Sequence, residues 1–92
     1  MARDHKILNK IALASDLQDE PLPGFSLVEI VDNCRVLIER HMGVTEYGRE
    51  RIVVKTSNGH INVSGSGMEL SRMTKSQLVI KGTIFGVSII KE

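Results

Sequence analysis

The stretch RIVVKTSNGHINVS, residues 51–64, contains two short runs in which apolar side chains recur at every second position. Ile52 and Val54 lie in the first run, and Ile61 and Val63 lie in the second. Because successive side chains of a strand point to opposite faces, each run predicts a strand with one buried and one solvated face. The Ser-Asn-Gly turn at 57–59 suits a tight connection, since Asn and Gly tolerate positive φ. The stretch therefore predicts an antiparallel β-hairpin.

The same alternation extends over the chain from residue 25, with turn residues between the runs. Met68 with Leu70, and Leu78 with Ile80, give further inward pairs. We predict strands near residues 25–31, 34–40, 43–47, 51–56, 60–64, 68–73, 77–81 and 83–90. The expected fold is mainly β, an antiparallel β-meander folded as a small sandwich or roll and preceded by one short N-terminal α-helix.

The first and last of these strands carry apolar side chains on both faces, which are Phe25, Leu27, Val28, Ile30 and Val31 in the first and Ile84, Val87 and Ile89 in the last. In the last strand the alternation changes phase across Gly86, which predicts a β-bulge there. Apolar residues on both faces indicate that these strands lie centrally under the N-terminal helix or cover a second subunit.

The chain divides into residues 1–24, a helix with a linker, and residues 25–92, an all-β domain. Asp4 suits the start of a helix that runs to about Asp16, and Pro21 and Pro23 mark the linker after it. On a helical wheel Ile7, Leu8, Ile11 and Ala12 form one stripe, and Leu13 falls off it. The stripe either packs on the sheet or docks on a partner, and the candidate docking residues are Ile7, Leu8, Ile11 and Leu13.

Composition limits the classes of partner. The formal charge of +1 and the three aromatic residues, Phe25, Tyr47 and Phe85, argue against a nucleic-acid surface. A single cysteine in a domain this small indicates a reducing, cytosolic compartment. No apolar run reaches the roughly 18 residues of a membrane span, and no signal peptide is evident. We therefore expect a protein partner, no nucleic acid and no membrane span in the chain itself.

No catalytic, cofactor or metal site is expected. His5, His41 and His60 lack the close spacing of a zinc motif, and no glycine-rich phosphate-binding motif is present. Cys34 is in phase with the apolar positions after it, which predicts a small buried side chain. Its alternative role, a nucleophile paired with His41, lacks an orienting third group. A second alternative is a small β-barrel that binds a ligand or single-stranded nucleic acid, which requires Tyr47, Arg49 and Arg51 to gather on one concave face.

Four motifs follow one another in a specific order and spacing. They are Leu37-Ile38-Glu39-x-His41-x-Gly43-Val44 with Tyr47, then Gly59-x-Ile61-x-Val63-x-Gly65, then Met68-Glu69-Leu70-x-x-Met73-Thr74-Lys75, and Leu78-x-Ile80-x-Gly82-x-Ile84. From Arg35 to Ile89 the chain resembles the YabP/YqfC family of sporulation proteins, and it is more similar to the YqfC branch. A helix and a Leu-Pro dipeptide, Leu22-Pro23, precede these motifs in the expected place.

The resemblance implies a process rather than a reaction. It implies a protein made in the mother cell of a sporulating bacterium that acts in spore envelope development. With the residues indicating a small β module without a catalytic site, we expect a non-enzymatic assembly or adaptor module in that process. YqfC-like proteins are generally encoded beside a membrane protein, so the resemblance also implies a membrane-bound partner and a cytoplasmic position peripheral to a membrane. We further expect a homo-oligomer. No catalytic residue is carried over.

Deletion of residues 1–20 separates the two roles of the N-terminal helix. If the stripe packs on the sheet, the deletion exposes Val28 and Ile30, and the domain aggregates or loses several kcal/mol of stability. We expect instead that the truncated protein melts normally and loses its partner, because Leu13 gives the helix a second apolar contact that one sheet would leave exposed. Melting temperature, light-scattering mass and partner recovery measure this, and a destabilised protein that still recovers its partner would contradict it.

Overall fold

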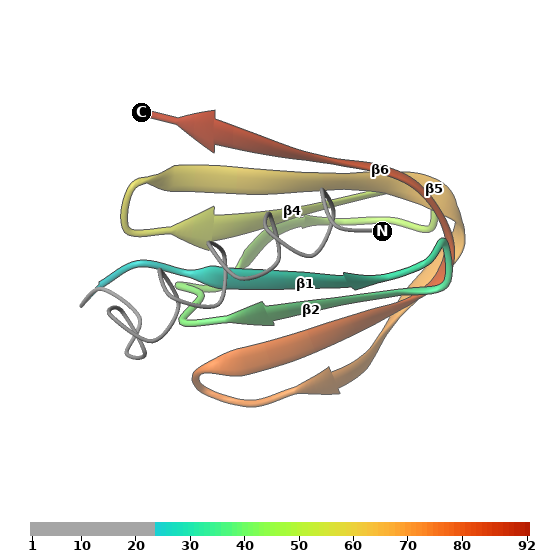
Figure 1. Ribbon diagram of the computed structural model, residues 1–92, viewed down its shortest axis with the longest axis horizontal. Helices are drawn as coiled ribbons and strands as arrows, with labels where there is room; N and C mark the ends of the chain where they lie inside the picture. Colours follow the sequence, from blue (N-terminus) through green and yellow to red (C-terminus); the bar gives the residue numbers. More distant parts are fainter. Residues whose placement is uncertain (1–23) are drawn as a thin grey trace, which may run out of the picture.

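A computed structural model describes residues 24–92, which form six antiparallel strands in one sheet (Figure 1). In chain order the strands are β1 (Leu27–Val31), β2 (Arg35–Glu39), β3 (Val44–Tyr47), β4 (Arg51–Thr56), β5 (Gly59–Met73) and β6 (Gln77–Lys91). The mainly β class is confirmed, and the expected N-terminal helix lies outside the described residues.

The strands lie in the order β1-β2-β6-β5-β4-β3. From β3 to β6 each strand pairs with the next one along the chain, as in a meander, and β1 pairs with β2 as a separate hairpin. The two parts join where β6 returns beside β2, a contact between strands that are not consecutive. The connection from β2 to β3 therefore crosses from one part to the other.

Two long strands replace four of the predicted ones. The expected breaks near Gly65 and Gly82 are bends inside β5 and β6, each of which is fifteen residues long. Figure 1 shows both strands turning sharply at the right-hand edge of the view. The start of β5 pairs with β4, whereas the start of β6 pairs with β2, so the single sheet folds over itself into two layers. The predicted sandwich is thus one folded sheet.

Glycine is required on the inner side of this bend because two backbones approach closely there. A Cβ on Gly65 would overlap the carbonyl oxygen of Thr83. Gly82 has φ of +145°, and a Cβ on it would lie 2.7 Å from Met68 Cα. Side chains at these positions would force β5 and β6 apart, so the fold-over depends on their absence.

The core lies between the two layers and is aliphatic apart from one methionine. Its buried members are Val36, Ile38, Ile52, Val54, Ile61, Val63, Met68, Leu78, Ile80 and Ile84. The predicted inward pairs in β4, in β6 and at the start of β5 are confirmed, and Leu70 is only partly buried. Aliphatic side chains therefore fill the interior, as the composition required.

β1 lies at an edge of the sheet, which excludes for this strand the first of the two predicted alternatives, a central position. The second alternative, that it covers a second subunit, stays a prediction. β6 is central where it pairs with β2, but it is much longer than β2, and its last part becomes an edge. The bulge predicted near Gly86 is confirmed, since Ser64 pairs with Gly86 and Gly65 pairs with Ile84, which leaves Phe85 as the extra residue.

Substitution Ile80→Asp tests the core. It places an unpaired carboxylate among fully buried aliphatic side chains, at a cost of several kcal/mol that a domain of this size does not tolerate. We expect no cooperative thermal transition by circular dichroism. Ser71→Asp, at the exposed extra residue of a register shift in β5, is the control and should melt close to the unchanged protein. A cooperative melt for Ile80→Asp would show that the inward face is assigned wrongly.

Candidate interaction surface

Each layer of the sandwich ends in an edge strand, and two of these edges border an apolar cleft. One side is β1 with the residues before it, and the other is the last part of β6. Phe25, Val28, Ile61 and Ile89 line a cleft of about 170 Å³ together with Ser26, Thr56 and Asn58. An adjoining cleft of about 290 Å³ shares Phe25 and Ile89 and extends to Lys91.

The strand register shows that these apolar side chains face inward. Val28 is paired with Ile38 and Ile30 with Val36, both of which are core residues. On the other edge, Val87 is paired with Val63 and Ile89 with Ile61. Side chains on one face of neighbouring strands point the same way, so this set belongs to the core face of the sheet.

The inward-facing side chains on these edges are nevertheless exposed. Ile30 is 52% exposed, Ile89 is 72% exposed and Phe25, which precedes β1, is 50% exposed. We call Phe25, Val28, Ile30, Val87 and Ile89 the open side. Val28 and Val87 are partly buried and pack against the core, while the other three side chains are at least half exposed. An exposed apolar patch is typical of an interaction surface.

Hydrogen bonds to the backbone hold Phe25 at the end of the open side. Ser26 Oγ donates to the carbonyl oxygen of Arg40 at 2.8 Å, and Arg40 Nε donates to the carbonyl oxygen of Phe25 at 2.5 Å. Ser57 Oγ donates to the carbonyl oxygen of Gly24, which ties the same segment to the turn between β4 and β5. These hydrogen bonds fix the backbone at Phe25 while its side chain stays exposed.

His41 links two connections of the fold. The backbone N–H of Gly43 donates to His41 Nδ1 at 3.0 Å, and His41 Nε2 lies 3.0 Å from the carbonyl oxygen of Thr74. Since a carbonyl oxygen only accepts, these partners assign the proton to Nε2. The ring thus joins the β2–β3 connection to the turn between β5 and β6.

Cys34 is exposed, so the prediction of a buried side chain is wrong. It lies in the turn before β2, where Asp32 has φ of 47° and the Cys34 thiol donates to the carbonyl oxygen of Val31 at 3.2 Å. The turn ends one residue later than the alternation predicted, which moves Cys34 out of the strand. His41 follows the other end of β2, about 20 Å away at the rise of a strand. The two residues do not form a dyad.

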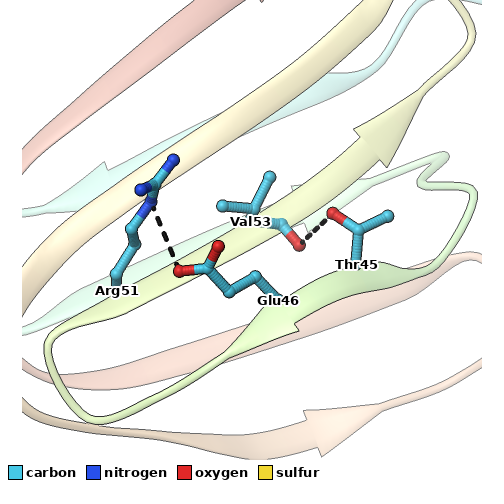
Figure 2. Close-up of polar contacts among 4 residues, drawn as sticks. All are labelled: Thr45, Glu46, Arg51 and Val53. Carbon is cyan, nitrogen blue, oxygen red and sulfur yellow. Dashed lines mark hydrogen bonds and ion pairs between the residues drawn. The ribbon is translucent and has the colours of Figure 1, made fainter.

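Tyr47 and Arg51 lie on opposite faces of the sheet. Tyr47 is paired with the buried Ile52, and its hydroxyl accepts from the backbone N–H of Leu70 at 3.4 Å. Arg51 lies on the outer face, where its Nε is 3.5 Å from Glu46 Oε2 (Figure 2). The gathering of Tyr47, Arg49 and Arg51 that the nucleic-acid alternative requires is therefore absent.

The predicted docking residues Ile7, Leu8, Ile11 and Leu13 lie outside the described residues. Within residues 24–92 no three His, Cys, Asp or Glu side chains come together as a metal site. The same part of the chain has no helix long and apolar enough to cross a membrane. The open side was not predicted as a site, although the apolar residues on both faces of the first and last strands were its signal.

Comparison with known proteins gives one match. The YabP family model matches residues 25–92, which is the whole of the six-stranded sheet. No curated protein and no solved structure matches the chain.

Replacement His41→Ala tests the linking role of the ring. It removes one acceptor and one donor from backbone groups, and we expect a loss of about 1–3 kcal/mol, or a melting temperature about 5–15 °C lower. His60→Ala is the matched control, because His60 Nδ1 only faces Glu92 Oε1 at 3.6 Å on the surface, and it should cost at most about 1 kcal/mol. Equal melting temperatures for the two variants would show that the His41 hydrogen bonds contribute little.

Proposed function

The chain belongs to the YabP family, and we propose that it is a non-enzymatic sporulation protein that acts as an assembly or adaptor module in spore envelope development. Family membership is consistent with a role in sporulation. The open side supports the more specific statement, because a small domain that exposes inward-facing aliphatic side chains along two edges is suited to bind another protein.

The shape and chemistry of the open side indicate the kind of partner. Its side chains are apolar, and the cleft between its two edges is lined by Phe25 and Ile89 together with Val28 and Ile61. Such a surface suits an apolar strand or helix of a protein, since aliphatic and aromatic contacts in a desolvated groove supply most of the energy of an interface.

The polar side chains that suggested chemistry have structural roles in the described domain. His41 uses both ring nitrogens for backbone partners, and the Cys34 thiol donates to a backbone carbonyl oxygen. Their separation along β2 leaves neither with a partner for nucleophilic catalysis. These contacts support a binding module rather than an enzyme.

The proposed setting is the mother cell during sporulation, in the cytoplasm and close to a membrane. A membrane-bound protein is the proposed partner, on the basis of the resemblance to YqfC-like proteins. The alternative of a barrel that binds single-stranded nucleic acid is less well supported, because Tyr47 and Arg51 lie on opposite faces.

Phe25→Glu tests the proposal. Phe25 is half exposed, so the charge should leave the fold intact while it disrupts apolar contact with a partner. We expect loss of the protein partner in pull-downs from sporulating cells and at least about a tenfold fall in heat-resistant spores, consistent with loss of an aromatic residue that contributes strongly to an interface. Met42→Glu is the matched control, because Met42 is equally exposed on the connection between β2 and β3.

Two outcomes would contradict the proposal. One is a Phe25→Glu protein that recovers the same partners and supports normal sporulation. The other is a Cys34→Ala protein that melts normally but fails in sporulation. Cys34 is exposed and is not part of the open side, so its loss would then indicate chemistry at the thiol.

A further inference from the structure

The last part of β6 is an edge without a backbone partner on its outer side. The final hydrogen bonds on that side join Gly82 N–H to Cys34 O at 3.3 Å and Ile84 N–H to Asn33 O at 2.7 Å. From Phe85 to Lys91 the strand pairs only with β5 in the described part of the chain. About half of its N–H and C=O groups point away from the sheet, as at any edge.

This edge differs from the other three in its side chains. β1 carries Glu29, the last part of β5 carries Glu69 and Arg72, and β3 is a four-residue strand with Glu46 and a register shift. Residues 83–90 of β6 read TIFGVSII and contain no charge and no proline. Charges, short length and bulges are the devices that keep edges from pairing with another chain, and in this edge only the single bulge at Phe85 is present.

Only a strand can satisfy this edge, because a helix uses its own backbone groups internally. The residues outside the described part, 1–23, are predicted to be a helix and a linker in which two positions are proline and lack an N–H. The identical edge of a second copy supplies a strand whose own outward N–H and C=O groups can pair with this edge. From Phe85 to Ile90 the two edges carry no charge, so they meet there without like-charge repulsion.

We propose that the outer edge of β6 pairs antiparallel with the same edge of a second copy, about a two-fold axis at Ser88. The proposal deepens the assembly role and rests on it. It makes one continuous sheet across two molecules, in the order β3-β4-β5-β6 in one subunit and β6-β5-β4-β3 in the other.

The side chains select this register. A two-fold axis perpendicular to the sheet keeps the core faces together, so each residue is opposite one on the same face. With the axis at Ser88, Val87 is opposite the partner subunit's Ile89, and Ile89 is opposite the partner subunit's Val87. An axis at Val87 would set Ile89 against Phe85, which is the bulged residue, and an axis at Ile89 would set Val87 against Lys91. Ser88 is the centre that pairs Val87 with Ile89 on both sides of the axis, and it places Lys91 opposite the bulged Phe85 at the two ends.

The same register extends the open side across the two-fold axis. Ile89, which is 72% exposed, gains an apolar neighbour in the same sheet. Ser88 faces its own copy on the outer face, where it is exposed and is paired within its own subunit with Asn62. A charge at this position therefore meets the same charge in a homodimer.

Charge exchange at Ser88 tests both the edge and the register. We expect the unchanged full-length protein to be a dimer by analytical ultracentrifugation, with Ser88→Lys and Ser88→Glu each weakening dimerisation by at least about tenfold. An equimolar mixture of the two variants should form a heterodimer, because opposite charges then meet across the axis. Ser71→Lys, on the exposed face of the charged last part of β5, should leave the dimer unchanged. Equal melting temperatures of the monomeric variants would exclude misfolding.

Hydrogen exchange gives a second readout. Amides of residues 85–91 that point outward should be protected in the unchanged protein and exchange faster in Ser88→Lys. A monomeric unchanged protein, or a Ser88→Lys protein that remains dimeric, would overturn the proposal. Failure of the dimer proposal can be distinguished from failure of the proposed function. If the unchanged protein is a monomer and Phe25→Glu still abolishes partner recovery, only the dimer proposal is wrong.

Discussion

The close approach of β5 and β6 at their bends is the constraint on which the rest of the structure depends. Backbone atoms occupy the space where a Cβ of Gly65 or Gly82 would lie, so the two long strands can turn together and carry the sheet over itself. One sheet thereby supplies both layers of a sandwich. The hydrophobic effect drives this closure, because each half otherwise exposes an apolar face to water.

A sheet that folds over itself has a closed side at the bend and open sides along its edges. β6 extends beyond β2, so within residues 24–92 Ile89 and its neighbours have β5 on one side and no strand on the other. β1 ends the opposite layer with Ile30 in the same condition. The feature that stabilises a small domain therefore also creates its apolar surface, and the proposed assembly role is based on this architecture rather than on a separate motif.

The polar residues support that architecture. His41 and Arg40 bind backbone groups of segments that are distant in sequence, and they hold Phe25 and the turn after β5 in place. An exposed ion pair, such as that of Arg51 and Glu46, contributes little to stability. In this member of the YabP family, a few hydrogen bonds to backbone groups therefore hold the segments that border the aliphatic edges.

Local alternation in the sequence determined the strands, the inward faces and the bulge at Gly86, because the two-residue period of a strand is a property of neighbouring residues. The residue spacing also showed that the sequence contains no zinc-binding or glycine-rich phosphate-binding motif. Only the tertiary structure decided that Gly65 and Gly82 bend strands instead of ending them, since glycine permits both outcomes and the choice depends on which backbone lies opposite. The tertiary structure also decided that β1 is an edge, that Cys34 is exposed and that the open side exists. These features depend on the pairing between β2 and β6, which joins segments about forty residues apart and which no local pattern specifies.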